Sequence, residues 1–418
     1  MADTNYYGDK PLSLPRLAYR RLAKGVQETP DRRAELLAAA AAELNGAPGD
    51  LRKMKFVLPD YLRRLLTAEE AANLEAGIAA RHAQAQRLKM AFPHASDEFS
   101  LKSEFLGTVL DLSGGPSLRG GGRFFTIGSC FARNIAKYLT SRGYEAQAFQ
   151  MAEDLNSPIS NAVILDLLQR PEAERGGLIA DWVGRLFPEA DAAQHSAAAE
   201  GLLRQIGELA VSLATADCVV MTLGNLVDFF SADGDASQPL LERVFPKFVA
   251  VTAIENLESA ANAAARLKRL GAVLRLATHD EAEEAIGLCV AGVRSVTSAP
   301  LVITLSPVPV DNVMGLAGPL RSAIEIDAVS KGRLRSALDE AWPALEAAHA
   351  PLAYYPSFEI VRWIAPMVTT PIFGREDGAA RHVSASILDA VCGLFVDRFV
   401  AWTPDAAAPE PARVLDAT

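Results

Sequence analysis

Three short runs of mostly apolar residues recur along the chain, and a turn that contains glycine or proline follows each one. The runs are 124–127, 218–223 and 301–305. Apolar residues at consecutive positions indicate a strand that is buried on both faces, which is the usual state of a strand inside a parallel sheet. Stretches with helical spacing separate the three runs. This alternation predicts an α/β fold with a doubly wound, mostly parallel sheet flanked by helices.

Several helices can be placed by their end signals. Asp280 and Glu283 have the spacing of a capping box, which predicts a helix that opens there and continues to Val293. Further helices are predicted over 198–213, 254–270, 330–348 and 384–399.

The first ninety residues show helical signals without strand signals. Thr29-Pro30 begins a helix that ends at Asn45-Gly46, and Thr67 with Glu70 forms a capping box for a helix that reaches Met90. We therefore expect a helical N-terminal extension over residues 1–91 and an α/β domain over 92–403. An Ala, Pro and Glu-rich tail over 404–418 is expected to be disordered.

Composition and charge narrow the class of protein. The 418 residues are 50% hydrophobic, yet no apolar segment approaches the roughly 20 residues that span a bilayer. The N-terminus has no basic region followed by an apolar run. Four cysteines lie far apart without a CxxC pair, which argues against a disulfide framework or a metal site. These features predict a soluble, cytoplasmic protein without a membrane span.

The net charge of −10 is unevenly distributed. Between Lys10 and Ala91 there are 15 Lys and Arg against 9 Asp and Glu, so this part carries +6 and the rest carries −16. Solvated helix faces explain such a split, and so does docking of the extension to an acidic protein partner. Nucleic acid is not expected as a partner, because the whole chain is acidic and the basic residues are not interleaved with aromatic ones.

The candidate chemistry follows the first buried strand. Gly128 allows a sharp turn, and Ser129 and Cys130 come where the strand ends and a helix starts. Free N–H groups and the helix dipole at such a place favour an anion and lower the pKa of a thiol. A nucleophile at this position therefore has donors for an oxyanion beside it.

Gly128-Ser129-Cys130-Phe131-Ala132 resembles the motif of the GSCFA family, bacterial proteins that are similar to the SGNH (GDSL-type) hydrolases and acyltransferases. Four later stretches agree with it: Val219-Val220-Met221-Thr222-Leu223-Gly224, Leu305-Ser306-Pro307-Val308-Pro309, Ser330-Lys331 and Tyr354-Tyr355-Pro356-Ser357-Phe358-Glu359-Ile360. The resemblance implies an SGNH-hydrolase-like fold for the α/β domain.

The resemblance also implies roles for individual residues. Aligning Gly128-Ser129-Cys130 with the Gly-Asp-Ser of SGNH enzymes gives Cys130 the place of the nucleophile, with Ser129 as the alternative. His382, just before the last predicted helix, resembles the general base. The family's Asp three residues before this His is Ala379 here, so Asp377, Glu376 or a backbone carbonyl would have to orient the imidazole.

Oxyanion or substrate-binding groups are expected from the same strand ends and from the family stretches. The candidates are Asn156, Gly224, Asn225, Lys331 and Arg133. In the alternative structural interpretation the motif is a tight turn, Cys130 is a small buried apolar group and His382 caps a helix.

The resemblance implies an acyl-ester enzyme, either an esterase or an O-acyltransferase, which acts through a covalent acyl-enzyme on a carbohydrate or another hydroxyl-bearing substrate. No cofactor is expected beyond an acyl donor such as acyl-CoA in the case of a transferase. The alternative is a non-catalytic glycan-binding or scaffold protein in polysaccharide assembly.

Overall fold

The computed structural model describes residues 14–46, 60–87, 92–93, 99–110, 112, 118–119, 122–149, 155, 157–232, 237–256, 263–310, 313, 315–319, 322–374 and 380–401. Residue contacts divide the chain into two compact units. One is Met1–Glu98 with Gly107–Asp111, and the other is Phe99–Leu106 with Leu112–Thr418. The predicted tail over 404–418 lies outside the described residues.

The first unit is helical. It contains α1 (Leu14–Glu28), α2 (Arg33–Gly46), α3 (Asp60–Arg63) and α4 (Ala68–Arg87). Its small apolar core includes Leu22, Val26 and Leu62. The predicted capping box is confirmed, because Thr67 N donates to Glu70 at 2.7 Å and Glu70 N donates to the Thr67 hydroxyl at 3.2 Å.

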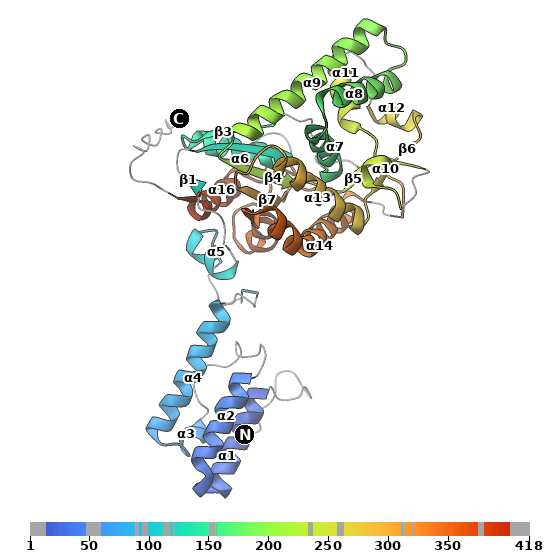
Figure 1. Cartoon of the computed structure of the whole chain (residues 1–418). Helices are drawn as coiled ribbons and strands as arrows, with labels where there is room; N and C mark the ends of the chain where they lie inside the picture. Colours follow the sequence, from blue (N-terminus) through green and yellow to red (C-terminus); the bar gives the residue numbers. More distant parts are fainter. Residues whose placement is uncertain are drawn as a thin grey trace. The chain divides into compact units, whose positions relative to one another are not determined.

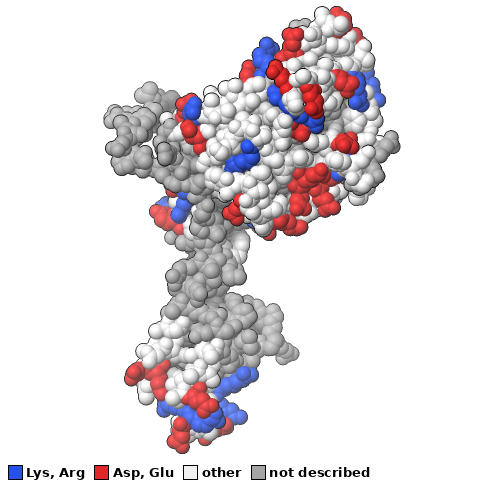
Figure 2. Space-filling view, viewed as in Figure 1, with Lys and Arg blue, Asp and Glu red and all other residues white. Residues whose placement is uncertain are grey.

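Basic and acidic side chains lie side by side on the face of this unit that Figure 2 shows. Ion pairs join several of them, among them Lys24–Glu28, Arg33–Glu70 and Arg63–Glu75. These pairs use acidic residues of the unit itself, so its net charge of +6 is unchanged by them. Docking of this unit to an acidic partner stays a prediction.

The second unit is built on a five-stranded parallel sheet in the order β3-β2-β4-β7-β8. The strands are β2 (Arg123–Gly128), β3 (Glu145–Ala148), β4 (Cys218–Leu223), β7 (Leu301–Leu305) and β8 (Leu352–Tyr354). Every residue of β4 and β7 is buried, as their uninterrupted apolar sequences predict. The expected α/β class with a parallel sheet and flanking helices is confirmed.

Two groups of helices flank this sheet (Figure 1). In the first, α6 (Cys130–Ser141) packs on β2, β3 and α16 (Ala385–Phe399). In the second, α13 (His279–Arg294) packs between α7 (Pro158–Gln169) and α14 (Ala323–His349). The apolar core runs through the sheet and the second group. No helix among the described residues is long and apolar enough to cross a membrane.

The remaining elements cover the outer side of the second group of helices. They are α8 (Glu172–Leu186), α9 (Ala192–Thr215), α10 (Leu240–Arg243), α11 (Lys247–Asn256), α12 (Ala263–Arg269) and the antiparallel pair β5 (Val227–Ser231) and β6 (Ala272–Leu276). Short elements complete the unit: α5 (Ser103–Val109), β1 (Leu118–Arg119) paired with β9 (Val400–Ala401), and the helical turns 357–359, 360–364 and 365–367.

Three helix predictions had the wrong bounds. The helix predicted over 254–270 is two helices, α11 and α12, and β6 follows them. α9 and α14 begin earlier than predicted, because Asp191 and Ser322 form capping boxes that the apolar pattern does not reveal. The capping box of α13 is formed by Thr278 and Glu281 instead of Asp280 and Glu283, since Thr278 is extended and its hydroxyl accepts from Glu281 N.

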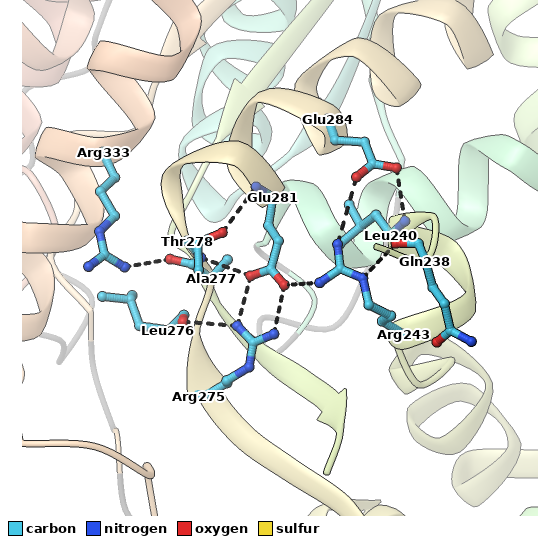
Figure 3. Close-up of polar contacts among 10 residues, drawn as sticks. All are labelled: Gln238, Leu240, Arg243, Arg275, Leu276, Ala277, Thr278, Glu281, Glu284 and Arg333. Carbon is cyan, nitrogen blue, oxygen red and sulfur yellow. Dashed lines mark hydrogen bonds and ion pairs between the residues drawn. The ribbon is translucent and has the colours of Figure 1, made fainter. Parts of the chain in front are cut away.

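Glu281 also joins α13 to the β5–β6 pair through a buried charge cluster (Figure 3). Arg275 on β6 donates to both of its carboxylate oxygens at 2.7 Å, and Arg243 on α10 donates to one of them. Arg275 also stacks over the Phe230 ring, 3.6 Å from its centroid. All of these partners are side chains of helices and strands of this unit, so the cluster has a structural role and holds α13, α10 and β6 together.

Candidate functional site

The strand order reverses between β2 and β4. After β2 the chain adds β3 on one side, and it then adds β4, β7 and β8 on the other side. Ligands of open parallel sheets bind beyond the carboxyl ends of the strands at such a reversal. The residues that follow β2, β4 and β7 therefore form the candidate site.

A glycine is required at the end of β2. Gly128 has φ of +115°, and a Cβ built on it would lie 2.0 Å from the Thr222 carbonyl oxygen of β4. Only a residue without a side chain allows the two strands to approach so closely while the chain turns into α6.

Ser129 anchors the start of α6. Its hydroxyl accepts from Phe131 N at 3.2 Å, which makes it the N-cap, and lies 2.7 Å from the Thr222 hydroxyl. Its backbone N–H donates to the same Thr222 oxygen at 2.7 Å. Because Ser129 is only 4% exposed and its hydroxyl is engaged on two sides, the geometry favours a positioning role for it.

Removal of the Thr222 hydroxyl tests this anchor. Thr222→Val leaves the buried Ser129 N–H without its acceptor, so we expect the free energy of unfolding to fall by about 1–3 kcal/mol. Urea denaturation measures the change. Thr140→Val on α6 is the matched control, since its exposed hydroxyl donates to the main-chain carbonyls of Ala136 on α6 and Ala146 on β3 and accepts from no buried N–H of the described residues. An equal loss in both variants would contradict a special role for Thr222.

Cys130 is the first residue of α6 and is 8% exposed. Lys331 on α14 is buried, and its ammonium donates to the Gly224 carbonyl after β4 and, at 2.7 Å, to the Ser306 carbonyl after β7. Cys130 lies near enough to Lys331 that a thiolate there would raise the pKa of this lysine. The structure thus brings Cys130, Gly224 and Lys331 together where three strands end.

Lys331 has an unusual electrostatic environment. Burial lowers its pKa to about 8, and the attraction of Asp327 and Cys130 offsets part of that fall, whereas Arg362 adds to it. Asp327 lies one helical turn before Lys331 and forms an ion pair with Arg362 at 2.6 Å. Sequence reasoning missed both partners. The sequence could have indicated Asp327 by its position four residues before Lys331 of the family stretch Ser330-Lys331, which is the spacing of one helical turn.

His382 lies in the turn before α16. The His382 carbonyl accepts from Gly374 N at 3.0 Å. The adjacent Val383 forms an isolated antiparallel β-bridge with Phe373. The Nε2 atom is buried, so the ring does not project into solvent. The Arg381 guanidinium reaches the Pro309 carbonyl at 3.5 Å, which brings this turn against the segment after β7.

Comparison with known proteins identifies the α/β unit. The model of the GSCFA family matches residues 123–395, which cover every strand and helix of the candidate site. The chain belongs to the GSCFA family. Searches of the curated proteins and of the solved structures find no significant match.

This GSCFA protein has four cysteines, which are all buried and form no disulfide bond, and Cys130 of the family motif is one of them. Burial raises the pKa of the Cys218 and Cys289 thiols far above the usual range, and that of Cys392 to about 12. These three thiols remain protonated at neutral pH. Cys130 differs from them because it stands at a helix N-terminus next to a lysine.

Of the remaining predicted residues, the structure describes Asn225 and Arg133. Asn225 turns its Oδ1 back to accept from Val227 N at 2.8 Å, which closes the turn after β4. Arg133 is exposed on α6. Asn156 and Asp377 lie outside the described residues. Within the described part of the chain, no group of His, Cys, Asp and Glu could hold a metal ion.

Proposed function

We propose that this GSCFA protein is an SGNH-type acyl-ester enzyme that forms a covalent thioester on Cys130. The doubly wound, SGNH-like fold is part of the proposal. Taken in chain order, the central strands have the order 2-1-3-4-5, which is one of the two common doubly wound arrangements and directs ligands to the β2–β4 reversal.

The observation that carries the proposal is the placement of Cys130 and the buried Lys331 at neighbouring strand ends. Cys130 begins a helix, and a buried ammonium acts on it from the ends of β4 and β7. Both features favour the thiolate, which is the nucleophilic form of cysteine. A turn or a packing residue would require neither feature.

The reaction proceeds in two displacements. The Cys130 sulfur attacks the acyl carbon, the bond between this carbon and the leaving oxygen breaks, and the leaving alkoxide takes up a proton. Water or a substrate hydroxyl then attacks the thioester, loses its proton to a base and releases the thiolate. Phe131 N and Ala132 N already donate to Ser129, so the stabilisation of the oxyanion in both steps is assigned to the positive end of the α6 dipole. His382 is our candidate for the group that moves the protons.

The substrate class follows from the chemistry and from the SGNH resemblance. An ester on a carbohydrate or another hydroxyl-bearing molecule would be the acyl donor for hydrolysis. A transferase would take the acyl group from a donor such as acyl-CoA and give it to such a hydroxyl. The two reactions differ in whether water reaches the thioester.

An acylation experiment tests the proposal. The full chain is incubated with p-nitrophenyl acetate, quenched in acid and analysed by intact and peptide mass spectrometry. We expect one acetyl group on Cys130 and none on the protein with Cys130→Ala. Cys392→Ala is the control that keeps the adduct, because Cys392 is a buried thiol of α16.

The lifetime of the adduct tests the role of His382. His382→Gln is expected to slow release of the acetyl group by about 10²-fold or more, as loss of a general base does. An adduct on Ser129 would transfer the nucleophile's role to that residue. A protein that binds glycans without any acyl adduct would support the scaffold alternative and refute the enzyme.

A further inference from the structure

Two buried charged side chains and a half-buried arginine lie together at the ends of β4 and β7. Lys331 and Asp327 are 2% and 3% exposed, and the side chain of Arg362 on the turn 360–364 is 26% exposed. Two of them are cations and one is an anion, so the cluster carries one excess positive charge. An uncompensated buried charge is strongly unfavourable in a protein interior.

Asp327 is directed to Arg362 and to the segment after β7. One of its oxygens accepts from Arg362 at 2.6 Å, and the other accepts from Val310 N at 3.1 Å. Arg362 also reaches the Pro307 carbonyl at 3.4 Å. These contacts pair the charges of Asp327 and Arg362 and at the same time fix the segment that Lys331 holds at Ser306.

Lys331 therefore lacks a full counter-charge of its own among these three residues. Its hydrogen bonds go to two backbone carbonyls, which carry only partial charges. The further ionisable group at these strand ends is Cys130 on α6. The preceding Ser129 contacts the Thr222 hydroxyl at 2.7 Å, and Lys331 binds the Gly224 carbonyl two residues beyond Thr222. Arg381 is a further cation near the segment after β7, where it reaches the Pro309 carbonyl, and it is partly exposed and therefore partly solvated. The titratable His382 follows it in the chain.

We propose that Cys130 rests as a thiolate that is the counter-ion of Lys331, and that Asp327 and Arg362 are positioning residues which set this balance by pairing with each other. This inference rests on the proposed function in one respect, since it gives the charge state of the proposed nucleophile.

This charge balance predicts that the three charge variants change the thiolate fraction of Cys130 in different directions. Lys331→Met removes the counter-ion of the thiolate. Arg362→Gln releases the Asp327 carboxylate to neutralise Lys331, so the thiolate is again disfavoured. Asp327→Asn has the reverse effect, because it leaves two cations for which Cys130 is the remaining anion. General loosening of the structure would move all three variants in the same direction.

The test is the rate at which iodoacetamide alkylates Cys130 between pH 5 and 7, below the pKa of about 8 at which Lys331 loses its proton. The sulfur–carbon bond forms as iodide leaves, so the rate follows the thiolate fraction. Wild-type protein should be half-maximal well below the value of about 8.5 for an ordinary thiol. Lys331→Met and Arg362→Gln should react about tenfold more slowly at pH 6.5, and Asp327→Asn should react faster at pH 5.

Two controls accompany the measurement. Asp339→Asn removes an exposed carboxylate of the same helix that pairs with Arg335, so its profile should match wild type. Cys218, Cys289 and Cys392 are at most 2% exposed and report unfolding, since they are labelled only if the core opens. Arg362→Lys keeps the charge and should restore the profile lost in Arg362→Gln. This pair still decides the question if Asp327→Asn does not fold.

An ordinary thiol profile in the wild type, or profiles of the folded charge variants that shift together or not at all, would overturn the inference. Alkylation requires no acyl chemistry, so the two proposals fail separately. The expected profiles without an acetyl adduct would refute only the enzyme, and an adduct with an ordinary thiol profile would refute only the charge balance.

Discussion

Gly128→Ala is expected to lower the free energy of unfolding by about 3–5 kcal/mol, from backbone strain together with steric overlap. A φ of +115° is unfavourable for any residue with a Cβ, and this Cβ would lie 2.0 Å from the Thr222 carbonyl oxygen. The obstacle is backbone, so a rotamer change cannot relieve it. β2 and β4 would have to separate at their carboxyl ends, which is where the candidate site lies.

Urea denaturation of the full chain measures this effect, and far-UV circular dichroism shows whether the variant folds. Gly207→Ala is the matched control, because a Cβ at this position of α9 meets no atom within 4 Å. Alanine is the better helix former there and should stabilise the protein by about 0.5–1 kcal/mol. Similar behaviour of the two variants would show that the close approach of β2 and β4 is unimportant.

Glu281→Gln is expected to destabilise the protein by about 3–5 kcal/mol at pH 7, because it removes the anion between two arginines. Glu281 is 3% exposed and Arg243 is buried with it. The amide can keep some hydrogen bonds, but Arg275 loses its counter-ion and Arg243 is left with the more distant Glu284, 3.8 Å away (Figure 3).

The pH dependence of stability gives a second readout. Burial raises the pKa of Glu281, but hydrogen bonds from Arg275, Thr278 N and Arg243, with the charge of Arg275, outweigh it and bring the pKa down to about 2. A carboxyl group with a lowered folded pKa stabilises the protein above its unfolded value of 4.5. This contribution, about 3 kcal/mol, is lost as the pH falls through 4.5 towards 2.

The gap in stability between wild type and Glu281→Gln should therefore be constant from pH 7 to 5 and narrow below pH 4.5. Urea denaturation at a series of pH values measures the gap. Glu283→Gln on the same helix is the control, since Glu283 is exposed and should change stability by less than about 0.5 kcal/mol. A constant gap down to pH 3 would show that Glu281 does not titrate in this window.

The sequence by itself determined the central elements of the α/β unit. The apolar runs of β4 and β7 fix their place inside the sheet, and Gly128 followed by a helical pattern fixes the turn that presents Ser129 and Cys130. Such features are local, because consecutive apolar residues indicate burial of a strand on both faces and a single glycine permits the turn that follows. The GSCFA motif is local in the same way, and the family assignment is confirmed.

Only the tertiary structure decided how the charges of the site are arranged. Asp327 and Arg362 are 35 residues apart in sequence and resemble surface residues, yet they form an ion pair in which Asp327 is buried, one helical turn from Lys331. Sequence could name Lys331, but its burial and its two carbonyl partners depend on how α14 packs across the ends of β4 and β7. The energy of a charge depends on its distance from other charges and on its removal from water, and the folded chain sets both.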